Sequence, residues 1–157
     1  MDKPARILII DDDENIRKVL QTILDDEGYL TDAAETAKKG IEKTEKAFFN
    51  LALIDVRLPD MEGIELLTKL RETKPKMRKI IVTGYPTLQN AVAAVNKGAD
   101  AYVMKPFDVE KILLTIKDQL KKQAEEKKFS EEKIAEFIET RVKELDTEAE
   151  TISRKSA

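Results

Sequence analysis

The sequence predicts an α/β fold in which five parallel strands form one sheet with helices on both faces. Short apolar runs alternate with longer segments of helical periodicity, and the alternation repeats five times along the chain. The apolar runs are continuous, which is typical of strands buried on both faces. The 157 residues suffice for one domain of this kind and an additional segment.

Each element has a local signal in the sequence. Runs rich in Ile, Leu and Val indicate strands, apolar residues three and four positions apart indicate helices, and Gly or Asp marks several helix ends. In chain order we predict a strand at 7–10, a helix over 16–24 closed by Gly28, a weaker strand at 29–33, a helix over 36–46, a strand at 51–54, a helix over 64–73, a strand at 80–82, a helix over 88–96 closed by Gly98, a strand at 101–104 and a helix that begins near Asp108.

The composition changes after about residue 120, where charged residues of both signs become dominant. Phe129-Ser130 interrupts this run, and Ser130 is the expected N-cap of a further helix. We therefore predict a domain over residues 1–122 and a charged helical extension over 123–157. Apolar residues recur at helical spacing in this extension, at Ile134, Phe137, Ile138, Val142, Leu145, Ala149 and Ile152.

Composition excludes several function classes. The net charge of −3 argues against a nucleic-acid binder driven by bulk charge. The absence of cysteine and histidine removes disulfides, thiolate chemistry, histidine metal sites and Ser-His triads. No apolar run approaches the roughly 20 residues that span a bilayer. We therefore expect a cytoplasmic protein with no membrane association.

Polar residues follow four of the apolar runs. Asp11 and Asp12 follow the first strand, Asp55 the third, Thr83 the fourth and Lys105 the fifth. An Asp after a strand is by itself most often a helix cap or a loop residue, and this is the role we expect for the neighbouring Asp13. Parallel strands, however, end at one edge of the sheet, so the five groups are expected to share one pocket.

This combination of charges favours phosphoryl chemistry. Packed carboxylates need a hard divalent cation, and Mg²⁺ is typically held by few carboxylates and several waters. Lys105 supplies a second positive charge and Thr83 a hydroxyl donor. A metal, a lysine and a hydroxyl would together stabilise a phosphoryl group, with a carboxylate as nucleophile.

The chain resembles the response regulator receiver domain of the CheY-like kind over about residues 5–122. The resemblance lies in "ILIIDDDENIR", "LALIDVRLPDMEGIELL", "IIVTGYPT" and "GADAYVMKPFD", in matching order and spacing. It implies a flavodoxin-like sheet with strand order 2-1-3-4-5. It also implies a phosphorylation-dependent role in two-component signal transduction, with Mg²⁺ as cofactor and a histidine kinase as phosphodonor.

The resemblance assigns a role to each residue of the pocket. Asp55 would be the phosphoacceptor, and Thr83 and Lys105 would bind the phosphoryl group. The Mg²⁺ ligands would be Asp11, Asp12, Asp55 and the backbone carbonyl of Arg57.

The resemblance also implies a switch. Tyr102 would be the aromatic residue that turns inward when Thr83 moves toward the phosphate, and a surface from Leu88 to Leu120 would bind a downstream protein. The bond between Lys105 and Pro106 would be cis. Bulky Tyr85 suggests slow self-dephosphorylation, so that the chain would have phosphoacceptor chemistry without being an enzyme.

Three alternatives concern the function and the assembly. A haloacid dehalogenase-like phosphatase would leave Asp55 unexplained. It also needs a later acidic metal motif, and this sequence shows none after Lys105. The chain could be a receiver fragment of a longer transcriptional regulator, although the extension is too short and evenly charged for direct nucleic-acid binding of its own. A homodimer could form through residues 130–152, which fit about three weak heptads, or through the Leu88–Leu120 face.

Overall fold

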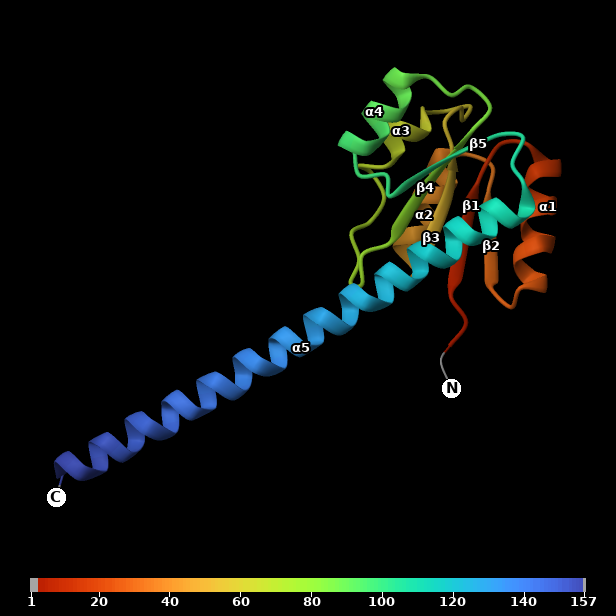
Figure 1. Ribbon diagram of the computed structural model, residues 1–157. Coiled ribbons are helices and arrows are strands. Elements are labelled where there is room, and N and C mark those ends of the chain that lie inside the picture. Colours follow the sequence, from red (N-terminus) through yellow and green to blue (C-terminus); the bar gives the residue numbers. More distant parts are fainter. Residues whose placement is uncertain (1–2, 157) are drawn as a thin grey trace. The chain divides into compact units, whose positions relative to one another are not determined.

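Five strands form one parallel sheet with the order β2-β1-β3-β4-β5, as predicted (Figure 1). The computed structural model describes residues 3–156, and side chains as far as residue 153. Residues 1–2 of the predicted domain and residue 157 of the predicted extension therefore lie outside the described residues. The strands span Arg6–Ile10 (β1), Leu30–Ala34 (β2), Leu51–Asp55 (β3), Arg78–Thr83 (β4) and Ala101–Met104 (β5).

Helices connect the strands, and hydrogen-bonded caps fix where most of them begin. They span Glu14–Asp26 (α1), Ala37–Lys46 (α2), Gly63–Leu66 (α3), Leu88–Asn96 (α4) and Val109–Ser156 (α5). The side chains of Asp13, Thr36 and Thr87 accept backbone N–H bonds at the starts of α1, α2 and α4. Gly28 and Gly98 follow α1 and α4 with φ of 92° and 100°, as expected of helix C-caps.

The sheet separates two apolar layers. On one face, Leu20 and Leu24 of α1 pack with Ile112 and Ile116 of α5 against the sheet. On the other face, α2, α3 and α4 contribute side chains such as Ala37, Leu66 and Ala94. Every residue of β3 and β4 is buried, which explains why their sequence shows no alternation of apolar and polar residues.

The predicted helix over 64–73 is much shorter in the structure. α3 ends at Leu66, and the next turn tightens, with Thr68 N donating to Glu65 O and Lys69 N to Leu66 O. The buried ammonium of Lys79 donates to the carbonyl of Leu67 at 2.8 Å. The apolar periodicity reflected burial of Leu67 and Leu70, both of which lie in the core after the helix has ended.

The predicted break at Phe129-Ser130 is wrong, because α5 is continuous from Val109 to Ser156 and Ser130 lies inside it. The C-terminal helix is thus present, but as the continuation of the fifth helix. Contacts divide the chain into two units, the first ending at Gln123 and the second beginning at Ala124. Across the described residues, no helix has both the length and the hydropathy of a bilayer span.

Candidate functional site

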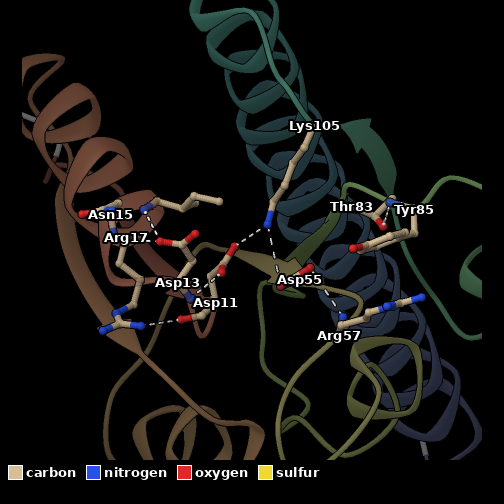
Figure 2. A network of polar contacts seen from close by, with 10 residues as sticks. Asp11, Asp13, Asn15, Arg17, Asp55, Arg57, Thr83, Tyr85 and Lys105 are labelled. Carbon is tan, nitrogen blue, oxygen red and sulfur yellow. Dashed lines mark hydrogen bonds and ion pairs between the residues drawn. The ribbon is translucent and has the colours of Figure 1, made fainter.

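The predicted polar residues meet at the carboxyl edge of the sheet (Figure 2). Asp55 is the last residue of β3 and Thr83 the last of β4, whereas Asp11 follows β1 directly. Lys105 follows β5 and extends toward the carboxylates of Asp11 and Asp55. This convergence results from the parallel register, since Ile10 pairs with Ile54 and Asp55 with Val82.

Three carboxylates lie close together at this edge. One oxygen from each of Asp11, Asp12 and Asp55 lies within 4.8 Å of the others, with Asp11 and Asp55 buried and Asp12 exposed. The ammonium of Lys105 lies 2.8 Å from Asp11 Oδ2 and 3.7 Å from Asp55 Oδ2. Lys105 therefore pairs with two of the three acids, and this cluster of side chains carries an excess of negative charge.

The surroundings of Asp55 raise the pKa of its carboxyl group. Burial and then the neighbouring charge of Asp11 raise the pKa of its carboxyl from 3.8 to about 6, with a smaller contribution from Asp12. Lys105 and the backbone N–H of Arg57, which donates to Asp55 Oδ1 at 3.4 Å, oppose this rise. A further positive charge at the site would therefore stabilise the ionised carboxylate.

The donor set fits a hard divalent cation. Carboxylate oxygens grouped at this distance, one of them exposed, suit an ion that keeps part of its water shell, as Mg²⁺ does. Histidine and cysteine are absent from the chain, so softer metals find no preferred ligand here. The acidic cluster can thus bind a metal ion through oxygen ligands.

Two loops carry side chains that stack beside this cluster. The guanidinium of Arg57, after β3, lies 3.7 Å from the ring centre of Tyr85, after β4. Thr83 Oγ1 accepts the backbone N–H of Tyr85 at 3.0 Å, which leaves its own O–H to donate to a ligand. The bond between Lys105 and Pro106 is cis, as predicted.

Two further predicted residues contribute no side chain to the carboxylate cluster, although the backbone N–H of Asp13 donates to Asp11 Oδ1 at 2.9 Å. Asp13 caps α1 by accepting from Asn15 N and Ile16 N, as expected of a residue outside the pocket. Tyr102 packs against the apolar layer formed by α2, α3 and α4. Its hydroxyl is buried and has no hydrogen-bond partner among the described residues.

Two supporting residues were not predicted from the sequence. Arg17 Nη1 donates to the backbone carbonyl of Asp11 at 2.8 Å. The carboxylate of Asp60 accepts from Ala37 N and Lys38 N at 2.9 Å each, and so ties the loop after β3 to the start of α2. Neither has a local signal, because an Arg on a helix and an Asp in a loop are ordinary surface residues.

Comparison with known proteins relates this chain to response regulators. A model of the response regulator receiver domain matches residues 7–117. The transcriptional regulatory protein YkoG of Bacillus subtilis, named as uncharacterized, is 34% identical over 74% of this chain and 51% of its own length. ZraR of Klebsiella oxytoca, also named a transcriptional regulatory protein, is 35% identical over 73% of this chain and 26% of its own length. The chain thus spans from about a quarter to about half of these relatives.

Solved structures share the fold. A CheY-like receiver domain protein from Methanospirillum hungatei is 50% identical, with a TM-score of 0.76 over 79% of this chain and 99% of that chain. The beryllofluoride-activated receiver domain dimer of NtrC4 is 37% identical, with a TM-score of 0.71 over 75% of this chain and 98% of that chain. The chain belongs to the response regulator receiver domain family of two-component systems.

Proposed function

We propose that Asp55 accepts a phosphoryl group from a histidine kinase, with Mg²⁺ as cofactor, and that this modification switches a protein-binding surface. The observation that carries the proposal is the buried carboxylate of Asp55, which shares the ammonium of Lys105 with the carboxylate of Asp11. A nucleophile, a cation and two further acids are thereby assembled at one sheet edge.

In this proposal Asp11, Asp12, Asp55 and the backbone carbonyl of Arg57 hold the Mg²⁺ ion. When bound, the ion neutralises charge on the transferring phosphoryl oxygens. The remaining contribution comes from the chain itself. The carboxylates of Asp11 and Asp12 keep the cation beside Asp55, and Arg17 holds the backbone that carries Asp11.

The transfer itself forms one bond and breaks one bond. An oxygen of ionised Asp55 attacks phosphorus, and the bond from phosphorus to the imidazole nitrogen of the donor histidine breaks, so that the electron pair leaves with the imidazole. Lys105 and the O–H of Thr83 bind the phosphoryl oxygens. Since only the ionised carboxylate is nucleophilic, a bound cation that lowers the pKa of Asp55 favours transfer at neutral pH.

The output follows from differential binding. Thr83 would exchange its bond with Tyr85 N for one that includes the phosphoryl group, and Tyr102 would occupy the space that this movement opens. The surface from Leu88 to Leu120 would then bind a downstream protein. Tyr85 stacked on Arg57 would restrict water at Asp55 and favour slow self-dephosphorylation without turnover of an external substrate.

A second proposal concerns the whole protein. The relatives named as transcriptional regulators are longer than the matched region, which supports a role for this chain as the receiver part of a longer regulator. In that case the switch would act on another domain of the same protein. The chemistry proposed for Asp55 is the same in both cases.

The experiment is intact-protein mass spectrometry after incubation with Mg²⁺ and acetyl phosphate. We expect the wild type to gain one phosphoryl group, and Asp55→Asn or wild type in EDTA to gain none. Asp13→Asn, which changes the neighbouring cap residue, serves as the matched control and should be modified like the wild type. An adduct of equal yield on Asp55→Asn would overturn the assignment of the phosphoacceptor.

A further inference from the structure

The second unit of the chain is helical, and the structure describes its side chains as far as residue 153. Every described side chain from Ala124 to Ser153 is exposed. Most helical stability in proteins comes from packing an apolar face, and isolated helices are marginal in water. Large apolar residues are nevertheless frequent here, namely Phe129, Ile134, Phe137, Ile138, Val142, Leu145 and Ile152, each at least 47% exposed. Within this unit the described apolar side chains thus form an exposed face.

The apolar residues form a seam with heptad spacing. The steps between successive seam residues alternate between three and four, the pattern of positions a and d in a two-stranded coiled coil. From Ala135 on, the a positions are Ala135, Val142 and Ala149, and the d positions are Ile138, Leu145 and Ile152. Before Ala135 the same register places Lys128 at a and Glu131 at d, so the apolar seam begins at Ala135. Ile134 borders the seam, whereas Phe129 and Phe137 lie outside it.

The charges beside the seam select an orientation for the partner helix. The e positions are all acidic, being Glu125, Glu132, Glu139 and Asp146, and the g positions are Lys127, Ile134, Arg141 and Glu148. In a parallel pair each g residue faces the e residue of the next heptad of the partner. Lys127 would then face Glu132, and Arg141 would face Asp146, both with opposite charges. An antiparallel pair would bring the acidic e positions of the two helices together.

We propose that residues 124–152 pair with the same segment of a second copy of this chain, as a parallel, in-register, two-stranded coiled coil. The second copy is the fitting occupant because the seam from Ala135 to Ile152 is apolar on both helices and the flanking charges complement each other only in this arrangement. In the single chain Arg141 bonds Glu144 at 3.0 Å, and its remaining N–H groups can reach Asp146 of the second copy. This inference does not depend on phosphoryl transfer at Asp55.

This 157-residue chain lacks cysteine, so single substitutions can report the orientation of the pair. Under mild oxidation Ala135→Cys and Ala149→Cys, both at a positions, should each form a disulfide-linked dimer on their own. Thr140→Cys and Thr147→Cys lie at f positions on the opposite side and are the matched controls. If the pair were antiparallel, a positions would face d positions of the partner, so neither a-position variant would cross-link alone, but a mixture of Ala135→Cys and Ile152→Cys would.

The charge pattern gives a second test. In analytical ultracentrifugation, Arg141→Glu should weaken self-association of the full chain about tenfold, because two symmetry-related attractive pairs become repulsive. Adding Asp146→Arg should restore it, since the opposite charges are then exchanged between the helices. Cross-linking no greater than that of Thr140→Cys, or a wild type that stays monomeric at every concentration, would overturn the proposal. Phosphorylation by acetyl phosphate should be unchanged in these variants. A failure of phosphorylation would therefore count against the proposed function of Asp55 and not against the coiled coil.

Discussion

The two ends of the sheet both contain buried polar side chains, but these groups are satisfied very differently. At the amino end, Asn50 Oδ1 accepts from Arg6 N at 2.9 Å, and its amide donates to Gln123 Oε1 at 3.1 Å. The amide of Gln123 donates in turn to Asn50 O and Lys76 O. At the carboxyl end, Asp11, Asp12 and Asp55 lie close together, and the ammonium of Lys105 contacts Asp11 and Asp55.

This difference separates a structural network from a reactive one. The neutral amides at the amino end exchange complementary hydrogen bonds and need no further ligand. At the carboxyl end, burial and then the neighbouring charge of Asp11 raise the pKa of Asp55 to about 6. Folding therefore keeps this end in a state that a bound cation or a proton would relieve. Variants at the two ends should respond differently to pH and to Mg²⁺.

The largest effect is expected where the backbone of the carboxyl end is most crowded. In Gly63→Ala the new Cβ would lie 1.9 Å from the carbonyl oxygen of Asp55, and the backbone would have to move. We expect a loss of more than about 4 kcal/mol in the free energy of unfolding, measured in urea. Gly84→Ala is the control, since its Cβ meets only Lys105 Cβ, at 3.9 Å, and should change stability by less than about 1 kcal/mol. An equal loss in both variants would contradict the steric explanation.

At the amino end, Asn50→Ala should cost roughly 2 to 3 kcal/mol of unfolding free energy. The substitution removes the acceptor for Arg6 N and the donor to Gln123 Oε1. Because no titratable group takes part in either bond, the loss should be the same with Mg²⁺ or EDTA and at pH 5 or 7.5. A loss that changed with Mg²⁺ would link this network to the carboxyl end and weaken the comparison.

At the carboxyl end, Asp55→Asn should raise the free energy of unfolding in the absence of metal, whereas Asn50→Ala lowers it. The folded pKa of Asp55 lies near 6, above its ordinary value of 3.8, so the folded state holds more protons between these values. The metal-free wild type therefore loses stability as pH rises from about 4 to about 6, by up to about 3 kcal/mol.

The asparagine variant avoids this loss. In EDTA at pH 7.5 it should unfold at a higher urea concentration than the wild type, and the gap should close near pH 4. Saturating Mg²⁺ should also narrow the gap, because the ion stabilises the wild-type carboxylate. A variant that is less stable than the wild type in EDTA at pH 7.5 would refute the electrostatic account.

The smallest effect is expected at Asp13. Asp13→Ala should cost about 1 kcal/mol through loss of the α1 cap, whereas Asp13→Ser should retain most of the stability. Both variants should bind Mg²⁺ like the wild type, as measured by calorimetry. A tenfold loss of Mg²⁺ affinity in both would mean that this third acid belongs to the metal site.

Local sequence predicted the strands because continuous apolar runs indicate burial on both faces. Their alternation with helices predicted parallel strands, which end at one edge of the sheet. Two helices were mispredicted for physical reasons that lie outside the local sequence. α3 stops early where the ammonium of Lys79, from β4, bonds Leu67 O, and this contact joins distant parts of the chain. Ser130 is a residue type that often caps helices, which predicted a helix start there, yet α5 continues through it.

The supporting residues of the site were beyond prediction for the same reason. Asp60 caps a helix more than 20 positions away in the sequence, and Gln123 bonds Asn50 across 73 positions. Such contacts depend on the assembled sheet. The positions of Asp55, Thr83 and Lys105 could be predicted because each directly follows or ends a strand, where the fold itself determines the position.

The most direct test of the account is an NMR titration of the Asp55 carboxyl carbon, without metal and with saturating Mg²⁺. We predict a midpoint near pH 6 without metal, from burial and the charge of Asp11, and a clearly lower midpoint when Mg²⁺ is present. Asp55 titrating at its ordinary value, with no response to Mg²⁺, would contradict the claim that the carboxyl edge is a charged site completed by a cation.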